Sequence, residues 1–168
     1  PFVGRLVDAG VSSLKIEGRM KSIHYLASVV ALYRRVLDGR DVSEEEGFAA
    51  LGRVMNRGYC AGFMKGGINE DDYRFDNSQP GATSKFLGIA EPGERYEHAN
   101  RMTLLDVRNH ICGGETVEYL MPGGETGIAV LPALLQTIDG QELLEVNHGK
   151  TVMLPFDWPT FTVVRRVV

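Results

Sequence analysis

Apolar residues recur at helical spacing in the N-terminal half of the chain. Between residues 22 and 39 they recur at helical spacings of three and four, as in Ile23–Leu26, Ile23–Ala27, Ala27–Val30, Val30–Tyr33 and Tyr33–Leu37. Ser22 can cap the start of this helix and Gly39 can end it, so the pattern predicts a helix over residues 23–38. Farther on, Ser43 and Glu46 belong to an S-x-x-E capping box, which predicts a second helix running to about Arg53.

The residues before these helices follow a different pattern. Residues 1–10 have the apolar positions of a helix end, and the glycine at their close can terminate it. Residues 11–17 then predict a short strand with Leu14 and Ile16 on one face. Such a strand normally lies in a parallel sheet that is buried on both sides. No other strand alternates with a helix, and the chain begins with Pro1 rather than Met, so we expect the rest of that sheet to lie in a longer parent protein.

From residue 84 onward the apolar positions alternate in short runs separated by turn-forming residues. Asp139-Gly140 lies between two such runs, residues 134–138 and 141–146, and predicts a hairpin with a two-residue type I′ turn. Six or so strands in about 85 residues predict a small antiparallel β-barrel.

These patterns together predict an α+β fold with two domains. A short N-terminal strand and two helices, within residues 1–68, are expected to be the C-terminal end of a truncated catalytic (β/α) barrel. Residues 69–83 are polar and turn-forming, and they predict a linker. Residues 84–168 are expected to form a C-terminal β-barrel domain.

Charge is unevenly distributed between the two halves. The 168 residues have a net charge of −4, and residues 83–168 account for all of it, with 7 Lys and Arg against 11 Asp and Glu. The first 82 residues balance, 11 against 11. Binding of a polyanion such as RNA by bulk charge is therefore disfavoured, although a local basic cluster remains open. No apolar run approaches the roughly 18–20 residues of a membrane span, so no membrane partner is expected.

The cysteines and histidines offer no complete ligand set. Cys60 and Cys112 are distant in sequence and predict reduced thiols in a cytoplasmic protein. An iron–sulfur cluster usually takes four cysteines, so we expect no cofactor within this chain. The four histidines show no metal-ligand spacing with one another, and His110-x-Cys112 is too little alone, so no metal site is expected. They are His24, His98, His110 and His148.

The densest charge group lies at the end of the predicted N-terminal strand. It consists of Lys15, Glu17, Arg19 and Lys21. Barrel enzymes place catalytic and binding groups at the C-terminal ends of their strands. Arg19 and Lys21 would then bind a carboxylate or phosphate, while Glu17 orients them or acts as a base; Glu17 and Arg19 are the catalytic candidates. The alternative is an ion pair that only fixes the start of the following helix.

A glycine-rich loop over residues 56–67 supplies further candidates. Arg57 and Tyr59 join Lys15, Arg19 and Lys21 as candidate substrate-binding residues, because the loop could close over the mouth of a barrel. Its glycines could equally serve only a tight crossing into the linker. Cys60 has no base beside it in sequence, which weakens a nucleophilic role.

Three aromatic residues cluster near the C-terminus, Phe156, Trp158 and Phe161. Such a group can stack on a nucleic-acid base or can plug the end of a barrel. The acidic surroundings favour the plug.

Several blocks of the sequence resemble one known family. The segments concerned are Ser13–Ser22, Tyr25-Leu26-Ala27, Val29-Val30, Tyr33-Arg34, Asn56-Arg57-Gly58-Tyr59, Gly62-Phe63, Val107-Arg108-Asn109, Gly114-Glu115, Glu118-Tyr119, Pro122-Gly123-Gly124 and Arg165-Arg166. They are similar to the end of the catalytic domain and to the C-terminal β-barrel of the collagenase-like peptidase family (peptidase class U, number thirty-two). The first block is long and specific, whereas the barrel motifs are weaker.

The resemblance implies two kinds of parent enzyme. Some members are named as peptidases, and others resemble oxygen-independent hydroxylases of transfer RNA, ribosomal RNA or a quinone precursor. The hydroxylases use an iron–sulfur cluster whose cysteines lie upstream of the block that begins at Lys15; Cys60 and Cys112 match none of them. The cluster, if the parent has one, is therefore expected outside this chain.

Three functions follow as hypotheses. The first is a non-catalytic C-terminal fragment of a peptidase, whose barrel positions a protein or peptide substrate beside the catalytic domain of the same parent. The second is a self-contained peptidase in which Glu17, Arg19 and Cys60 converge. The third is part of an RNA or quinone-precursor hydroxylase whose barrel contacts RNA. A second copy of the chain could also pair with the exposed N-terminal strand and helix.

Overall fold

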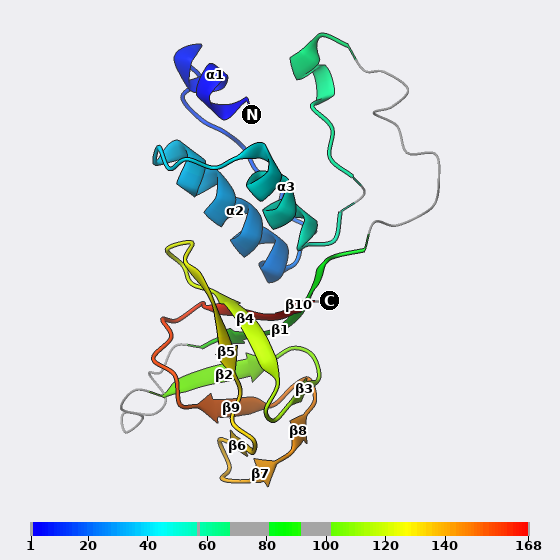
Figure 1. Ribbon diagram of the computed structural model, residues 1–168, viewed down its shortest axis with the longest axis vertical. Helices are drawn as coiled ribbons and strands as arrows, with labels where there is room; N and C mark the ends of the chain where they lie inside the picture. The colour runs from blue at the N-terminus through cyan, green and yellow to red at the C-terminus, as the bar shows by residue number, and fades with distance from the viewer. Residues whose placement is uncertain (1, 57, 68–80, 92–101, 168) are drawn as a thin grey trace. The chain divides into compact units, whose positions relative to one another are not determined.

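The computed structural model describes residues 2–56, 58–67, 81–91 and 102–167. The chain divides into two compact units, Pro1–Thr83 and Ser84–Val168 (Figure 1). Most of the predicted linker, residues 69–80, lies outside the described residues. Each unit has its own architecture and is described by itself.

The first unit is helical. Its described residues contain α1 (Val3–Asp8), α2 (Ile23–Leu37), α3 (Glu44–Gly52) and a short 3₁₀ helix, η1 (Gly62–Lys65). The two predicted helices are confirmed together with their caps: the Ser22 hydroxyl accepts from Tyr25 N, and the Ser43 hydroxyl accepts from Glu46 N. The Glu46 carboxylate accepts from the Arg35 guanidinium at 2.6 Å, which ties α3 to α2.

The predicted strand over residues 11–17 is wrong. The segment has no regular secondary structure and forms no ladder with any residue that the structure describes. It is held from both ends instead: Val11 N donates to Leu6 O at the end of α1, and a turn follows in which Lys21 N donates to Gly18 O. Local alternation of apolar residues suits a strand, but a strand exists only where another strand satisfies its backbone groups.

The second unit is a curled, barrel-like antiparallel sheet (Figure 1). Its eight strands follow the order β5-β4-β10-β1-β2-β9-β6-β7, and β3 and β8 form a separate two-stranded sheet. The α+β class with a C-terminal barrel is therefore confirmed. The strands are β1 (Ser84–Ala90), β2 (Thr103–Val107), β3 (Ile111–Cys112), β4 (Thr116–Leu120), β5 (Thr126–Val130), β6 (Leu135–Thr137), β7 (Glu142–Leu143), β8 (Glu145–Val146), β9 (Thr151–Leu154) and β10 (Val163–Val167).

The described residues thus form more strands than the six or so expected. The extra ones are β3, β7 and β8, which have two residues each, and β6, which has three. A run of two residues has no alternation to detect, so such strands emerge only from their pairing in the folded unit.

The loop at Asp139-Gly140 is not the predicted two-residue type I′ turn. Thr137 N donates to Gln141 O, so residues 138–140 form a three-residue loop. A type I′ turn would require positive φ at Asp139 as well, whereas only Gly140, at +82°, has it. The Thr137 hydroxyl donates to the Asp139 carboxylate and accepts from Gln141 N at 3.1 Å. These side-chain bonds stabilise the longer loop.

A single apolar core fills the barrel. It contains Leu87, Leu105, Val107, Ile111, Val117, Leu131, Leu135, Val146, Val152, Leu154 and Val164, all of them buried. Phe156 and Trp158 stack on each other, with ring centroids 4.3 Å apart, and pack against this core. Phe161 is instead 64% exposed, so it does not join the packed pair.

One ion pair is buried within this unit. Arg165 Nε donates to Glu118 Oε2 at 2.8 Å, and the two residues are direct partners on β10 and β4. No helix in the described part of the chain has the length and apolar character that crossing a bilayer requires.

Candidate functional site

The predicted charged segment lies at the start of α2, on the turn that leads into the helix. Gly18 lies close to α2, where a Cβ would lie 2.2 Å from Cδ2 of Leu26, so a larger residue there would require the Leu26 side chain to rotate. Glu17 Oε1 accepts from Arg19 N at 2.9 Å, so its carboxylate folds back onto the turn. This bond makes Glu17 a local structural group and takes up one of the two oxygens that a general base would use.

The basic side chains of this segment are available to a ligand. Lys15, Arg19 and Lys21 are all exposed. Among the residues that the structure describes, no ion pair joins Lys15 or Arg19 to an acidic group. The Lys21 ammonium lies 5.2 Å from the centre of the Tyr25 ring, a cation–π contact that orients it along α2.

Tyr59 has a structural role in its loop. Its hydroxyl donates to Leu51 O at 3.0 Å, which fastens the loop to the end of α3. Burial raises the pKa of Tyr59, and the nearby phenols of Tyr25 and Tyr33 raise it further, so it stays a neutral donor. Arg57, the other candidate of this loop, lies outside the described residues.

The structure does not bring together the residues of a self-contained peptidase. Cys60 is exposed, and no described hydrogen bond joins it or Tyr59 to Glu17 or Arg19. The two cysteines belong to different units, Cys60 to the helical unit and Cys112 to the barrel. An iron–sulfur cluster usually takes about four cysteines and this chain has two, so the absence of a cluster held by this chain alone stays a prediction.

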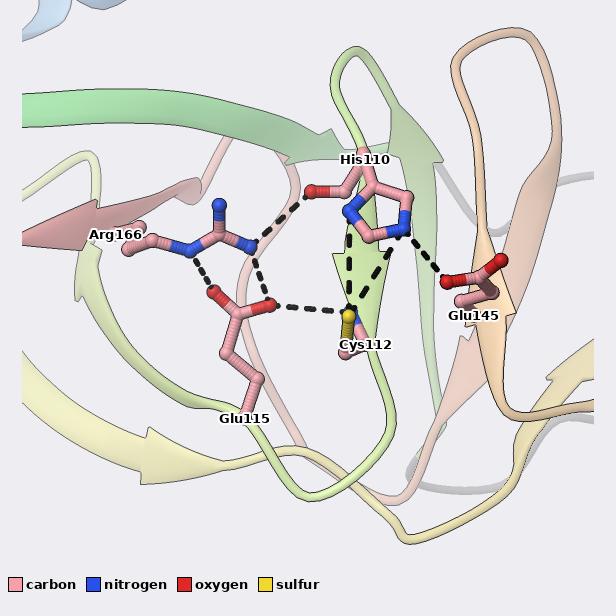
Figure 2. Close-up of polar contacts among 5 residues, drawn as sticks. All are labelled: His110, Cys112, Glu115, Glu145 and Arg166. Carbon is pink, nitrogen blue, oxygen red and sulfur yellow. Dashed lines mark hydrogen bonds and ion pairs between the residues drawn. The ribbon is translucent and has the colours of Figure 1, made fainter.

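A polar cluster in the barrel was missed by sequence reasoning. Figure 2 shows its five members, His110, Cys112, Glu115, Glu145 and Arg166. The pairing of β3 with β8 places Cys112 opposite Glu145. His110 Nε2 lies 3.0 Å from Glu145 Oε2, and Cys112 Sγ lies 3.9 Å from the same nitrogen.

One half of this cluster is a clamp that orders the backbone. The Arg166 guanidinium donates two hydrogen bonds to the Glu115 carboxylate (Figure 2). Nε donates to Oε1, and a terminal nitrogen donates to Oε2 at 2.7 Å. Glu115 Oε2 also accepts from Cys112 N, and Arg166 donates to His110 O at 3.3 Å. Burial alone would raise the pKa of Glu115, but the bonds from Arg166 and Cys112 N outweigh it and hold that pKa below its ordinary value.

Two features of the backbone place this clamp. Leu87 forms a bulge in β1, and its carbonyl accepts from Arg108 N and Asn109 N, which fixes the turn leading to His110. Gly113 follows Cys112 where no side chain fits, because a Cβ there would lie 2.0 Å from Ala133 O. The backbone that carries His110 and Cys112 is therefore held by its contacts with β1 and with Ala133.

The signal for this cluster in the sequence was incomplete. His110-x-Cys112 was visible as a possible pair of ligands, but Glu145 is 33 residues farther on and is joined to them only by the β3–β8 pairing. His110, Cys112 and Glu145 together offer one nitrogen, one sulfur and one oxygen within 4.8 Å of one another.

Comparison with known proteins finds matches along nearly the whole chain. Residues 1–73 match the family model described as peptidase family U32, and residues 82–165 match the one described as the peptidase family U32 C-terminal domain.

Three curated proteins that are similar to this chain show how the names of its relatives differ in function. The chain is 31% identical over 152 residues to tRNA hydroxylation protein P1 of Bacillus subtilis, covering 87% of this chain and 35% of that protein. It is 29% identical over 159 residues to tRNA hydroxylation protein P of Escherichia coli, covering 91% and 34%. It is 24% identical over 164 residues to Collagenase of Porphyromonas gingivalis, covering 92% and 38%. The chain thus spans about a third of the length of these relatives.

Proposed function

The chain belongs to peptidase family U32, and from that membership we propose that it is the C-terminal part of an RNA-hydroxylating enzyme with transfer RNA as substrate. In this proposal the chain binds and positions RNA beside the catalytic domain of its parent and performs no chemistry alone. The observation that carries it is the 31% identity to tRNA hydroxylation protein P1 over 87% of the chain.

The peptidase alternative has weaker support. It rests on the family's name and on the relative named Collagenase, which is 24% identical. In the described residues, Glu17 is bound to its own turn, and Cys60 makes no hydrogen bond to a base. A nucleophile needs a base within hydrogen-bond reach, so these residues support an accessory role better than proteolysis.

Charge favours the N-terminal segment over the barrel as the surface that contacts RNA. Residues 15–21 contain three basic groups and one acidic group, a net charge of +2, and the three basic side chains are exposed. The barrel has an excess of acidic residues, which opposes phosphate binding over its surface. We therefore assign the phosphate contacts to Lys15 and Arg19, while contact between the barrel and RNA stays a prediction from family resemblance.

Salt dependence of binding tests this assignment. Affinity of the full-length protein for transfer RNA should fall steeply as salt is added, and each phosphate contact should contribute about 0.7–0.9 to the logarithmic slope. The double variant K15A/R19A should flatten that slope by up to about 1.8 if both residues contact phosphates. The matched control K85A/K150A removes two exposed barrel lysines and should leave the slope unchanged.

Nucleoside analysis tests the reaction. Transfer RNA from cells that lack the full-length protein should lack a hydroxylated nucleoside, one that is heavier than its precursor nucleoside by one oxygen atom. Expression of the wild-type gene should restore this nucleoside. Restoration by K15A/R19A should be weaker than restoration by the K85A/K150A control. An unchanged nucleoside profile together with hydrolysis of gelatin by the purified protein would refute the proposal in favour of the peptidase.

A further inference from the structure

We propose that His110, Cys112 and Glu145 form a binding site for a divalent transition-metal ion, with Zn²⁺ as the preferred metal. The bound ion would link β3 to β8. The site goes beyond the RNA-binding proposal and does not depend on it, because its residues all belong to the barrel and the charged segment to the helical unit.

The distances fit a metal once the His110 ring and the Glu145 side chain rotate toward a common centre. Ligand atoms about 2.0–2.3 Å from a tetrahedral ion lie roughly 3.3–3.8 Å from one another. His110 Nε2 and Glu145 Oε2 are 3.0 Å apart, Cys112 Sγ and His110 Nε2 are 3.9 Å apart, and all three ligand atoms lie within 4.8 Å. Glu145 is the most exposed of the three, so its side chain can rotate to complete the set.

The same distances disfavour a catalytic Cys–His pair. Cys112 Sγ lies 3.9 Å from Nε2 and 4.0 Å from Nδ1 of His110, so the sulfur is equally far from both ring nitrogens and in line with neither. Proton transfer from a thiol requires a directed hydrogen bond to one nitrogen. In Figure 2 the nitrogen that faces Glu145 is Nε2; a metal would bind the unprotonated form of this nitrogen and so replace the hydrogen bond between Nε2 and the Glu145 carboxylate.

The backbone around the three ligands is already in place. Cys112 and Glu145 are partners in the β3–β8 ladder, and the Glu115–Arg166 clamp bonds both Cys112 N and His110 O. A preorganised backbone reduces the entropic cost of ordering the ligands around an ion. Because both oxygens of Glu115 are held by Arg166, that carboxylate stays outside the coordination sphere. The fourth position is then open to water.

The ligand chemistry selects the metal. Nitrogen, sulfur and oxygen donors in one tetrahedral set suit Zn²⁺, whereas Mg²⁺ and Ca²⁺ prefer oxygen alone. A thiolate and a carboxylate together balance the charge of the ion. The β3–β8 sheet has only two residue pairs, so a bond across it would stabilise a ladder that is too short to be stable alone.

Cobalt substitution provides a direct test on the full chain. Metal-free protein, prepared with a chelator and kept reduced with a phosphine, is titrated with Co²⁺ and then with Zn²⁺. We expect one ion per chain, with a sulfur-to-cobalt charge-transfer band and the intense visible bands of a tetrahedral site. C112S should abolish the charge-transfer band, and C60S, which changes the other cysteine, should preserve it.

Two further variants address the remaining ligands. H110A and E145Q should each lower the affinity for Zn²⁺ by at least about tenfold, and the controls H148A and E142Q should leave it unchanged. E145Q changes an exposed side chain, so it keeps the fold and the test intact if C112S or H110A destabilises the barrel. Zn²⁺ should also raise the Tm of the wild-type chain and not that of C112S.

Either of two results would overturn the site. One is an affinity for Zn²⁺ that E145Q and C112S leave unaltered. The other is a cobalt charge-transfer band that C60S removes and C112S retains.

Discussion

The buried ion pair between Glu118 and Arg165 determines how the barrel responds to the loss of a single charge. The Nε–Oε2 distance is 2.8 Å, and the side chains of Arg165 and Glu118 are only 2% and 10% exposed. At an effective dielectric constant of about 20, two unit charges at that separation attract by about 6 kcal/mol. Desolvation offsets much of this attraction in the intact pair, but removal of one partner leaves the other charge buried without its direct partner on the neighbouring strand.

Replacement of Glu118 by Gln is therefore expected to lower the free energy of unfolding of the barrel by about 3–5 kcal/mol. The double variant E118L/R165M should lose much less than the sum of its single substitutions, because apolar groups then replace both charges. Trp158 is the one tryptophan of the 168 residues and lies in the barrel, so urea unfolding followed by tryptophan fluorescence reports on this unit.

A matched control is available on β2. Asp106 pairs with Arg108, and their side chains are 17% and 44% exposed, so D106N should change the free energy of unfolding by less than about 1 kcal/mol. A loss for E118Q as small as that of D106N would refute the reasoning. So would a double variant whose loss equals the sum of E118L and R165M.

Two more predictions concern the clamp. The pKa of Glu115 lies below its ordinary value of 4.5, so its ion pair with Arg166 should stabilise the barrel above that pH and lose this contribution as the pH falls through the folded-state pKa. E115Q should flatten the pH dependence of tryptophan-monitored unfolding between about pH 7 and about pH 3, and a profile equal to that of the wild type would contradict this. G113A places a methyl group 2.0 Å from Ala133 O and should lower the free energy of unfolding by about 1–3 kcal/mol. In the control G123A the methyl group meets open space, so the free energy of unfolding should change by less than about 0.5 kcal/mol in the same assay. Equal losses for the two variants would contradict the close approach at Gly113.

Local features of the sequence predicted the helical elements well. Ser22 and Ser43 cap α2 and α3 as expected, because a cap and an apolar stripe are defined by residues within one or two turns of each other. The barrel class was also predictable from alternation and turn residues. The strand over residues 11–17 was not, since its existence depended on a partner strand that no local pattern can supply.

The candidate sites divide in the same way. Lys15, Glu17, Arg19 and Lys21 are neighbours in sequence, so the segment that they share is recognisable from the order of residues alone. Their contacts are not: Glu17 turns back to Arg19 N, and Lys21 turns to Tyr25.

The sequence by itself determined where the helices begin and that the second half forms a β-barrel, because short-range sterics, capping and apolar periodicity are properties of neighbouring residues. Only the tertiary structure decided that Cys112 faces Glu145 and that Arg166 grips Glu115 across 51 residues. Pairing of short strands is decided by burial of the shared core and by satisfaction of backbone hydrogen bonds across the whole unit. Residues far apart in the chain therefore become one site only when the barrel has folded.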